Sequence, residues 1–147
     1  MSRGTILLVE NDPRDEELTL RALRKNSIHD QVVVARDGVE ALDYLFVRGS
    51  HAGRDPNLLP RLVLLDLKLP RIEGLQVLRE LRGNLSTGLL PVVILTSSNE
   101  EEDRLAAYAA GTNSYVRKPV DFEQFTEIVR QLGDYWLILN EPPPARR

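Results

Sequence analysis

Five short apolar runs, each followed by a segment of helical spacing, constrain most strongly how this chain of 147 residues can fold. Several runs are apolar at consecutive positions, which is typical of strands buried on both faces of a sheet. The runs are TILLV (5–9), QVVVA (31–35), LVLLD (62–66), PVVILT (91–96) and SYVRK (114–118). The alternation predicts five parallel strands connected by helices.

The segments between the runs carry the spacing and the end signals of helices. Pro13 suits the first position of a helix, Asn99 suits an N-cap, and Gly111 suits the residue after a helix end. We predict helices at about 13–26, 38–47, 73–82 and 99–111, and a fifth from 122 to beyond 132. Five such units give an α/β, doubly wound sheet with its functional site at the carboxyl ends of the strands.

Polar side chains follow the predicted strands at the point where each strand ends. Because the carboxyl ends of parallel strands meet at one edge of a sheet, acids, a hydroxyl and an ammonium converge there. Carboxylate oxygens suit Mg²⁺, while Lys and Thr can bind the oxygens of an anion. These residues are Glu10, Asn11 and Asp12 after the first strand, Asp66 after the third, Thr96 and Ser97 after the fourth, and Lys118 and Pro119 after the fifth.

This set of side chains predicts phosphoryl transfer without a bound nucleotide. The chain has no GxxxxGK[ST] loop, so a phosphoryl group would be received on a side chain. Asp66 is the natural acceptor, because its carboxylate follows a buried apolar strand. Mg²⁺ would neutralise both the acceptor and the incoming oxygens, which leaves mostly positioning for the protein.

The charge balance and the cysteine count exclude other classes. The formal net charge is -3, with Lys and Arg interspersed among acids, so there is no basic stripe for nucleic acid. The absence of cysteine excludes a disulfide framework, a thiolate nucleophile and a zinc–sulfur site. The first apolar run is too short for a signal peptide, and no stretch approaches a membrane span. We therefore expect a cytoplasmic protein with no membrane or nucleic-acid partner.

Four motifs, in order and in spacing over essentially residues 5–132, are similar to those of a known family. The motifs are ILLVEND, LVLLDLKLPRIEG, PVVILTSS and YVRKP. The chain resembles the receiver domains of bacterial two-component response regulators. That resemblance implies a flavodoxin-like (βα)5 fold with strand order 2-1-3-4-5. It also implies a signalling phospho-acceptor rather than an enzyme, which binds Mg²⁺ and takes its phosphoryl group from a histidine of a sensor kinase.

The resemblance assigns a role to each matching position. Asp66 would be the phospho-acceptor, and Glu10 and Asn11 occupy the two acidic-pocket positions of the family. The backbone carbonyl of Lys68 would be a metal ligand, and Thr96 and Lys118 would bind phosphoryl oxygens. The peptide between Lys118 and Pro119 would be cis. Tyr115 would be the switch aromatic, which moves into space left by Thr96.

Asn11 departs from the family pattern, which usually has an acid there as a direct Mg²⁺ ligand. An amide oxygen can coordinate a hard cation but brings no charge, so we predict weaker Mg²⁺ binding. Asp12 could compensate, yet Pro13 makes Asp12 the expected N-cap and Asp15 the third helical residue. We favour Asp12 as a cap. The substitution also leaves open a second function, a non-phosphorylated interaction module whose metal pocket has partly decayed.

The segment GDYWLILNEPPP extends the fifth helix and places apolar side chains around most of its circumference. One small domain cannot easily cover all of these side chains. An exposed apolar patch usually marks an interface, so we predict a homodimer through the extension from about residue 133. The alternative is that the extension folds back on its own domain. We expect one domain over 1–140 and a disordered tail over 141–147. The interface residues would be Tyr135, Trp136, Leu137, Ile138 and Leu139.

Two additions narrow the resemblance further. The long second loop, VRGSHAGRDPN, and the Tyr-Trp extension look similar to stand-alone receivers that partner phytochrome-type histidine kinases. We therefore expect a kinase of the bacteriophytochrome type as the phosphoryl donor. Since only about a dozen residues remain beyond the fifth helix, the expected output is contact with another protein or relay of the phosphoryl group.

Overall fold

The computed structural model describes residues 4–28 and 31–144, so residues 145–147 of the predicted disordered tail lie outside the described residues. Its centre is one parallel sheet with strand order β2-β1-β3-β4-β5, as the sequence predicted. The strands are β1 (Thr5–Val9), β2 (Gln31–Ala35), β3 (Leu62–Leu65), β4 (Val92–Thr96) and β5 (Ser114–Arg117).

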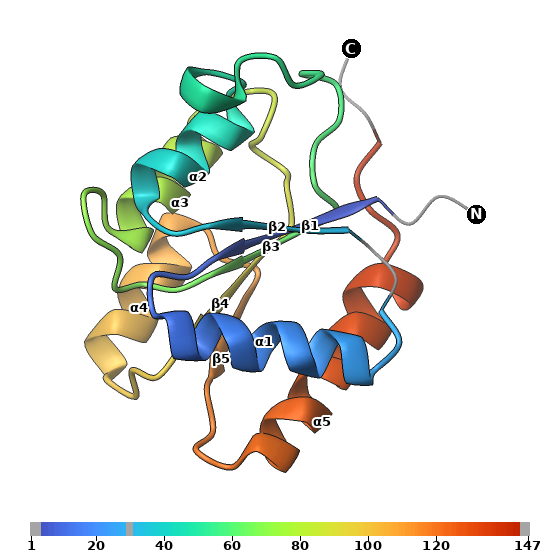
Figure 1. Cartoon of the computed structure of the whole chain (residues 1–147). Coiled ribbons are helices and arrows are strands. Elements are labelled where there is room, and N and C mark those ends of the chain that lie inside the picture. Colours follow the sequence, from blue (N-terminus) through green and yellow to red (C-terminus); the bar gives the residue numbers. More distant parts are fainter. Residues whose placement is uncertain (1–3, 29–30, 145–147) are drawn as a thin grey trace.

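Helices cover both faces of the sheet, which gives three layers (Figure 1). The face with α2, α3 and α4 and the face with α1 and α5 each have their own apolar core. The helices are α1 (Pro13–Lys25), α2 (Gly38–Leu45), α3 (Gly74–Arg82), α4 (Glu101–Ala110) and α5 (Phe122–Gly133). The fold is therefore the flavodoxin-like, doubly wound arrangement.

The central strands explain the consecutive apolar positions of the sequence. Along β1, Leu7 and Val9 contribute to the core under α2, α3 and α4, while Ile6 and Leu8 contribute to the core under α1 and α5. Successive side chains of a strand point to opposite faces, so a strand covered on both sides needs an apolar residue at every position. The edge strand β2 is correspondingly less buried.

Two predicted helix starts have different outcomes. Asp12 is the N-cap of α1, as predicted, because its side chain accepts hydrogen bonds from the backbone N–H groups of Arg14 (2.8 Å) and Asp15 (3.3 Å). The predicted cap at Asn99 is wrong, because α4 begins at Glu101. The preceding turn instead uses Ser98, whose hydroxyl accepts from the N–H of Glu100 and donates to Asp103. A serine in this turn already satisfies a free N–H group.

The extension after α5 continues as a π-helical turn, η2 (Asp134–Leu139). Trp136 and Leu137 are half-buried against the core under α1 and α5, so the extension partly folds back on its own domain. Tyr135, Ile138 and Leu139 remain exposed. The five residues predicted for a dimer interface therefore divide into two groups, and only the exposed group is available to a partner.

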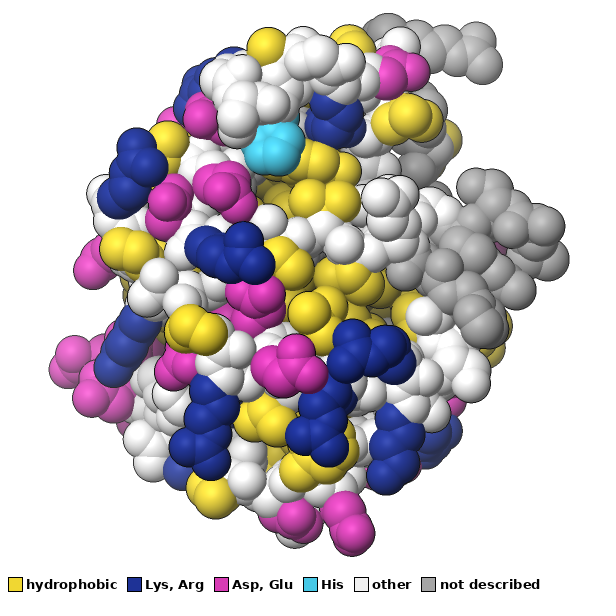
Figure 2. Space-filling view, in the orientation of Figure 1, with side chains coloured by type: hydrophobic (Ala, Val, Ile, Leu, Met, Phe, Trp, Pro, Cys, Tyr) yellow, Lys and Arg dark blue, Asp and Glu magenta, His cyan; other side chains and the backbone are white. Residues whose placement is uncertain are grey.

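The long loop before β3 is ordered by Arg54. Its guanidinium lies over the ring of Tyr44, 4.2 Å from the ring centroid, and donates to the Tyr44 carbonyl at 2.7 and 3.0 Å. On the face drawn in Figure 2, several Lys and Arg side chains gather over the lower part, with Asp and Glu side chains among and beside them. Within residues 4–28 and 31–144, no helix combines the length and the apolar character that crossing a membrane requires.

Candidate functional site

The candidate site lies at the carboxyl ends of the strands, as the topology predicts. Three residues that directly follow strands extend the backbone hydrogen bonding of the sheet. The N–H of Glu10 donates to Ala35 (2.9 Å), that of Asp66 donates to Val9 (3.1 Å), and that of Lys118 donates to Thr96 (2.7 Å). The sheet therefore determines where these three side chains begin.

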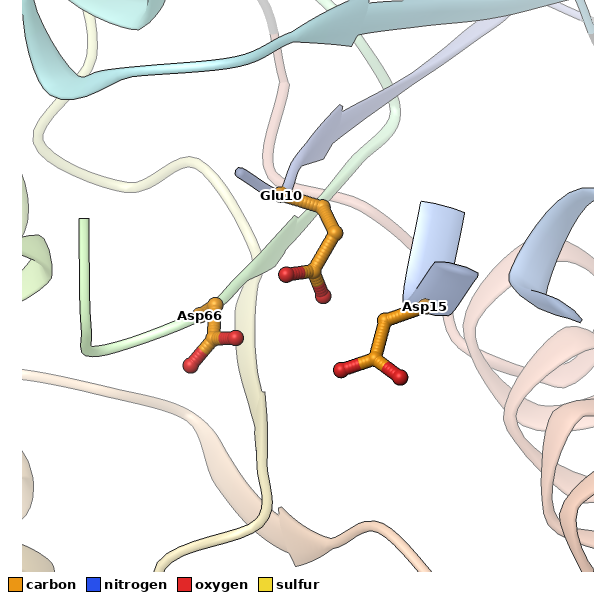
Figure 3. A group of neighbouring side chains, drawn as sticks. All are labelled: Glu10, Asp15 and Asp66. Carbon is orange, nitrogen blue, oxygen red and sulfur yellow. The ribbon is translucent and has the colours of Figure 1, made fainter. Parts of the chain in front are cut away.

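A fourth residue reaches the same place from the first turn of α1. Figure 3 shows the carboxylates of Glu10, Asp15 and Asp66 pointing toward one another. Between them lies the ammonium of Lys118, whose Nζ is 2.5 Å from Glu10 Oε1, 3.1 Å from Asp15 Oδ2 and 3.1 Å from Asp66 Oδ2. One cation thus contacts three carboxylates from three different elements.

Burial and the neighbouring charges shift the pKa values of Glu10 and Lys118. The Glu10 side chain is 3% exposed and that of Lys118 is 8% exposed. Desolvation raises the pKa of Glu10 to about 7, and it would be higher without the hydrogen bond and the charge of Lys118. Burial lowers the pKa of Lys118, but Asp66, Glu10 and Asp15 together raise it above its ordinary value. Lys118 therefore stays protonated.

The acidic group has the chemistry of a site for a hard divalent cation. Glu10, Asp15 and Asp66 each offer one carboxylate oxygen, and these oxygens lie within 4.8 Å of one another. Mg²⁺ prefers oxygen ligands and usually keeps several waters. Lys68, expected to offer its carbonyl, is exposed and donates its N–H to Asp66 Oδ1 at 3.3 Å. These residues fit Mg²⁺.

The structure changes which residues after β1 are candidates for binding the cation. Asn11 is exposed, and Asp12 is used as the helix cap. Asp15, which we assigned only to the first turn of α1, belongs to the acidic group. Its position five residues after Glu10 was the available signal, since the first turn of a helix after a strand lies over the end of that strand.

The two expected switch residues meet at the loop between β4 and α4. Thr96 ends β4 and is 1% exposed, and its hydroxyl accepts a long hydrogen bond (3.4 Å) from the N–H of Ser98. Tyr115 in β5 is half-buried, and its hydroxyl donates to the carbonyl of Ser98 (3.3 Å). Both side chains are therefore connected to the same loop residue.

The expected cis peptide between Lys118 and Pro119 is wrong for this structure, because the described residues contain no cis peptide bond. The trans form of an X–Pro bond is the more stable one by about 0.5–1 kcal/mol. In this structure Lys118 reaches the acidic group with the trans bond.

Comparison with known proteins gives one consistent family. The model of the response regulator receiver domain matches residues 6–130. The response regulator Rcp1 of Synechocystis sp. is 34% identical over 140 residues, which cover 95% of this chain and 93% of Rcp1. Its Mn(2+)-bound structure matches with a TM-score of 0.86 at 32% identity, over 96% of this chain and 99% of that one.

Two further solved structures come from phytochrome systems. The phosphorylated cyanobacterial phytochrome response regulator RcpA has a TM-score of 0.89 at 34% identity, over 97% of this chain and all (100%) of RcpA. The bacteriophytochrome response regulator AtBRR has a TM-score of 0.77 at 52% identity, over 96% of this chain and 100% of AtBRR. With these matches and the acidic group at the sheet edge, the chain belongs to the response regulator receiver domain family.

Proposed function

We propose that this protein is a response regulator that accepts a phosphoryl group on Asp66 in a Mg²⁺-dependent reaction. The main observation behind the proposal is the position of Asp66, which directly follows β3. Its carboxylate lies 3.1 Å from the Lys118 ammonium, beside the carboxylates of two further acids. An acceptor needs this combination of a fixed carboxylate and a nearby cation.

In the proposed reaction, an oxygen of Asp66 bonds to phosphorus as the bond from phosphorus to the donor histidine nitrogen breaks. Lys118 and Thr96 bind the oxygens of the transferred group, which positions it in line with Asp66. The chemistry that a bound Mg²⁺ supplies is neutralisation of carboxylate and phosphoryl charge. Glu10, Asp15 and Asp66 are the residues that would hold the ion.

The phosphoryl group would then act as a switch. The acyl phosphate has a charge of about -2 where the Asp66 carboxylate had -1, and its strong acceptor oxygens attract Lys118 and Thr96. Because Thr96 and Tyr115 both bond to Ser98, movement of Thr96 changes the loop before α4 and the position of the Tyr115 ring. The switched surface would serve a protein partner.

Similarity to phytochrome regulators supports a kinase of that type as the phosphoryl donor. RcpA and AtBRR are response regulators of a phytochrome and of a bacteriophytochrome, and each matches nearly the whole chain. We propose a sensor histidine kinase of the bacteriophytochrome type as the partner. A second candidate function, a non-phosphorylated interaction module, is favoured only by the amide at Asn11.

Treatment with acetyl phosphate and Mg²⁺ is expected to add the mass of one phosphoryl group to the wild-type protein and none to Asp66→Asn. Asn lacks the nucleophilic oxygen, although its shape is nearly the same. Intact-mass spectrometry measures the gain with and without Mg²⁺. Hydrogen exchange on the same samples is expected to change at Ser97–Asn99 in wild type only.

The matched control for this experiment is Asp43→Asn, which removes a carboxylate that pairs with Arg48 away from the site. This variant is expected to gain the same mass as wild type. If wild type gained no mass with Mg²⁺, the interaction module would become the better account of the chain.

We further propose a homodimer through the exposed part of the extension. Ile138 and Leu139 are 74% and 70% exposed, and Tyr135 beside them is 48% exposed. All three residues belong to the short π-helical segment η2, and a second copy of this segment would cover them.

Ile138→Asp is expected to convert a wild-type dimer into a monomer, because it places a charge in the centre of an apolar contact. Sedimentation velocity measures the change. Leu85→Asp is the matched control, since Leu85 has the same 74% exposure but lies between α3 and β4. The proposed dimer would be contradicted if the wild-type protein were monomeric, or if the Ile138→Asp variant sedimented as the wild type does.

A further inference from the structure

We propose that Asp15 supplies the negative charge that Asn11 does not bring to the cation pocket. Asp15 would thus be the third acid of the pocket, contributed by α1 and not by the loop after β1. The inference rests on the proposed Mg²⁺ site and names a residue that acts in it.

The start of α1 holds Asp15 in place. Pro13 and the Asp12 cap determine where the helix begins, and the N–H of Asp15 itself donates to Asp12 Oδ1 at 3.3 Å. The Asp15 side chain is 33% exposed, and its inner oxygen, Oδ2, is 3.1 Å from Lys118 Nζ. The ion pair with Lys118 directs the Asp15 side chain toward the acidic group.

The ammonium of Lys118 marks where a cation is stable in this pocket. It contacts Glu10 at 2.5 Å and Asp66 and Asp15 at 3.1 Å each. A divalent ion drawn to Glu10 and Asp66 therefore lies within a few ångströms of Asp15 as well. At such a distance in a partly buried site, the charge of Asp15 acts on the ion with or without an intervening water.

Asn11 and Asp12, the other candidates near Glu10, do not fill this role. Asn11 is exposed, and Asp12 uses its carboxylate on the N–H groups of Arg14 and Asp15. Within residues 4–28 and 31–144, Glu10, Asp15 and Asp66 are the one group of three or more acids, histidines or cysteines whose ligand atoms lie within 4.8 Å of one another.

A simpler role for Asp15 would be to hold Lys118 alone. The two roles predict different behaviour when Lys118 is absent. If Asp15 acts on the metal, its carboxylate still matters to Mg²⁺ binding in a Lys118→Ala background. If it acts only on Lys118, its removal in that background has no effect on Mg²⁺ binding.

Asp15→Asn is expected to weaken Mg²⁺ binding about 10- to 100-fold, both in wild type and in the Lys118→Ala background. Isothermal titration calorimetry with MgCl₂ measures the affinity. Asp12→Asn is the matched control, because it removes the same charge three residues away and Asn is an equally good helix cap. It is expected to change the affinity far less.

Asn11→Asp added to Asp15→Asn is expected to recover part of the lost affinity, because it returns a negative charge at the residue next to Glu10. The inference is overturned if wild type binds Mg²⁺ and Asp15→Asn binds it equally well, or if the effect vanishes in the Lys118→Ala background. The proposed function would stand in both cases. A wild type that neither binds Mg²⁺ nor gains phosphoryl mass would instead remove the proposed function itself, and this inference with it.

Discussion

Lys118→Ala is expected to lower the free energy of unfolding of the metal-free protein by about 3 kcal/mol at pH 8, the lower end for breaking a buried ion pair. Lys118 is the cation that the buried Glu10 and the nearby Asp66 contact in this structure. Its removal leaves their charges without a partner. Urea unfolding in the presence of EDTA measures the change.

The loss of unfolding free energy caused by Lys118→Ala is expected to become smaller as the pH falls toward 5. Burial already raises the pKa of Glu10 to about 7 from its ordinary 4.5, and loss of Lys118 raises it further. Between pH 4.5 and the raised pKa, Glu10 is protonated in the folded variant and ionised in the unfolded chain. The stability of the variant therefore falls as the pH rises through this window and recovers on acidification. Lys68→Ala, on an exposed lysine two residues after Asp66, is the control and is expected to have little effect. A deficit that did not depend on pH would contradict a buried, unpaired Glu10.

Gly74→Ala is expected to destabilise the fold by about 3 kcal/mol or more and to displace the loop that carries Asp66. A Cβ at Gly74 would lie 2.3 Å from the Asp66 carbonyl oxygen and 2.8 Å from the Leu67 Cα. Both neighbours are backbone atoms, so the main chain of the site would have to move. Thermal unfolding measures the loss of stability, and phosphoryl uptake from acetyl phosphate measures the displacement.

Gly53→Ala is the matched control for Gly74. A Cβ there meets nothing within 4 Å, and the residue is exposed. The substitution is expected to leave stability unchanged or to raise it by about 0.4–1 kcal/mol, since Ala restricts the unfolded chain. Equal losses at the two positions would show that the close approach of α3 to Asp66 is not what Gly74 provides.

The fold could be predicted from the sequence because its signals are local. Five apolar runs separated by helical segments specify a parallel sheet, and right-handed crossovers leave few topologies. Element ends were less certain. The cap of α1 was predicted, because Pro13 marks the first helical position. The start of α4 was wrongly placed at Asn99, because Asn is a favoured cap residue; in the structure Glu100 is the N-cap, and its N–H donates to the Ser98 hydroxyl.

The site was predictable where strands position the residue and less so elsewhere. Glu10, Asp66 and Lys118 follow strands, so topology alone brings them together. Asp15 was missed because a carboxylate in a first helical turn is ordinary there, and its direction depends on how α1 crosses the sheet. The trans peptide before Pro119 depends on tertiary packing, on which the sequence motif carries no information.

The structure divides the residues of the extension in a way that the sequence did not predict, for a similar reason. Its apolar residues indicate an interface, but a strict helical stripe does not describe the π-helical turn of η2. That turn directs Trp136 and Leu137 onto the domain's own core and leaves Ile138 and Leu139 outside. Which residues of the extension stay exposed therefore follows from the structure and not from the spacing.

The location of the phosphoryl group tests the central claim most directly. Borohydride reduces an aspartyl phosphate to homoserine, so peptide mass mapping after acetyl phosphate, Mg²⁺ and borohydride identifies the acceptor. We predict homoserine at position 66 and at no other aspartate. Homoserine at Asp12 or Asp15, or unmodified Asp66 in protein that has gained the phosphoryl mass, would contradict the account.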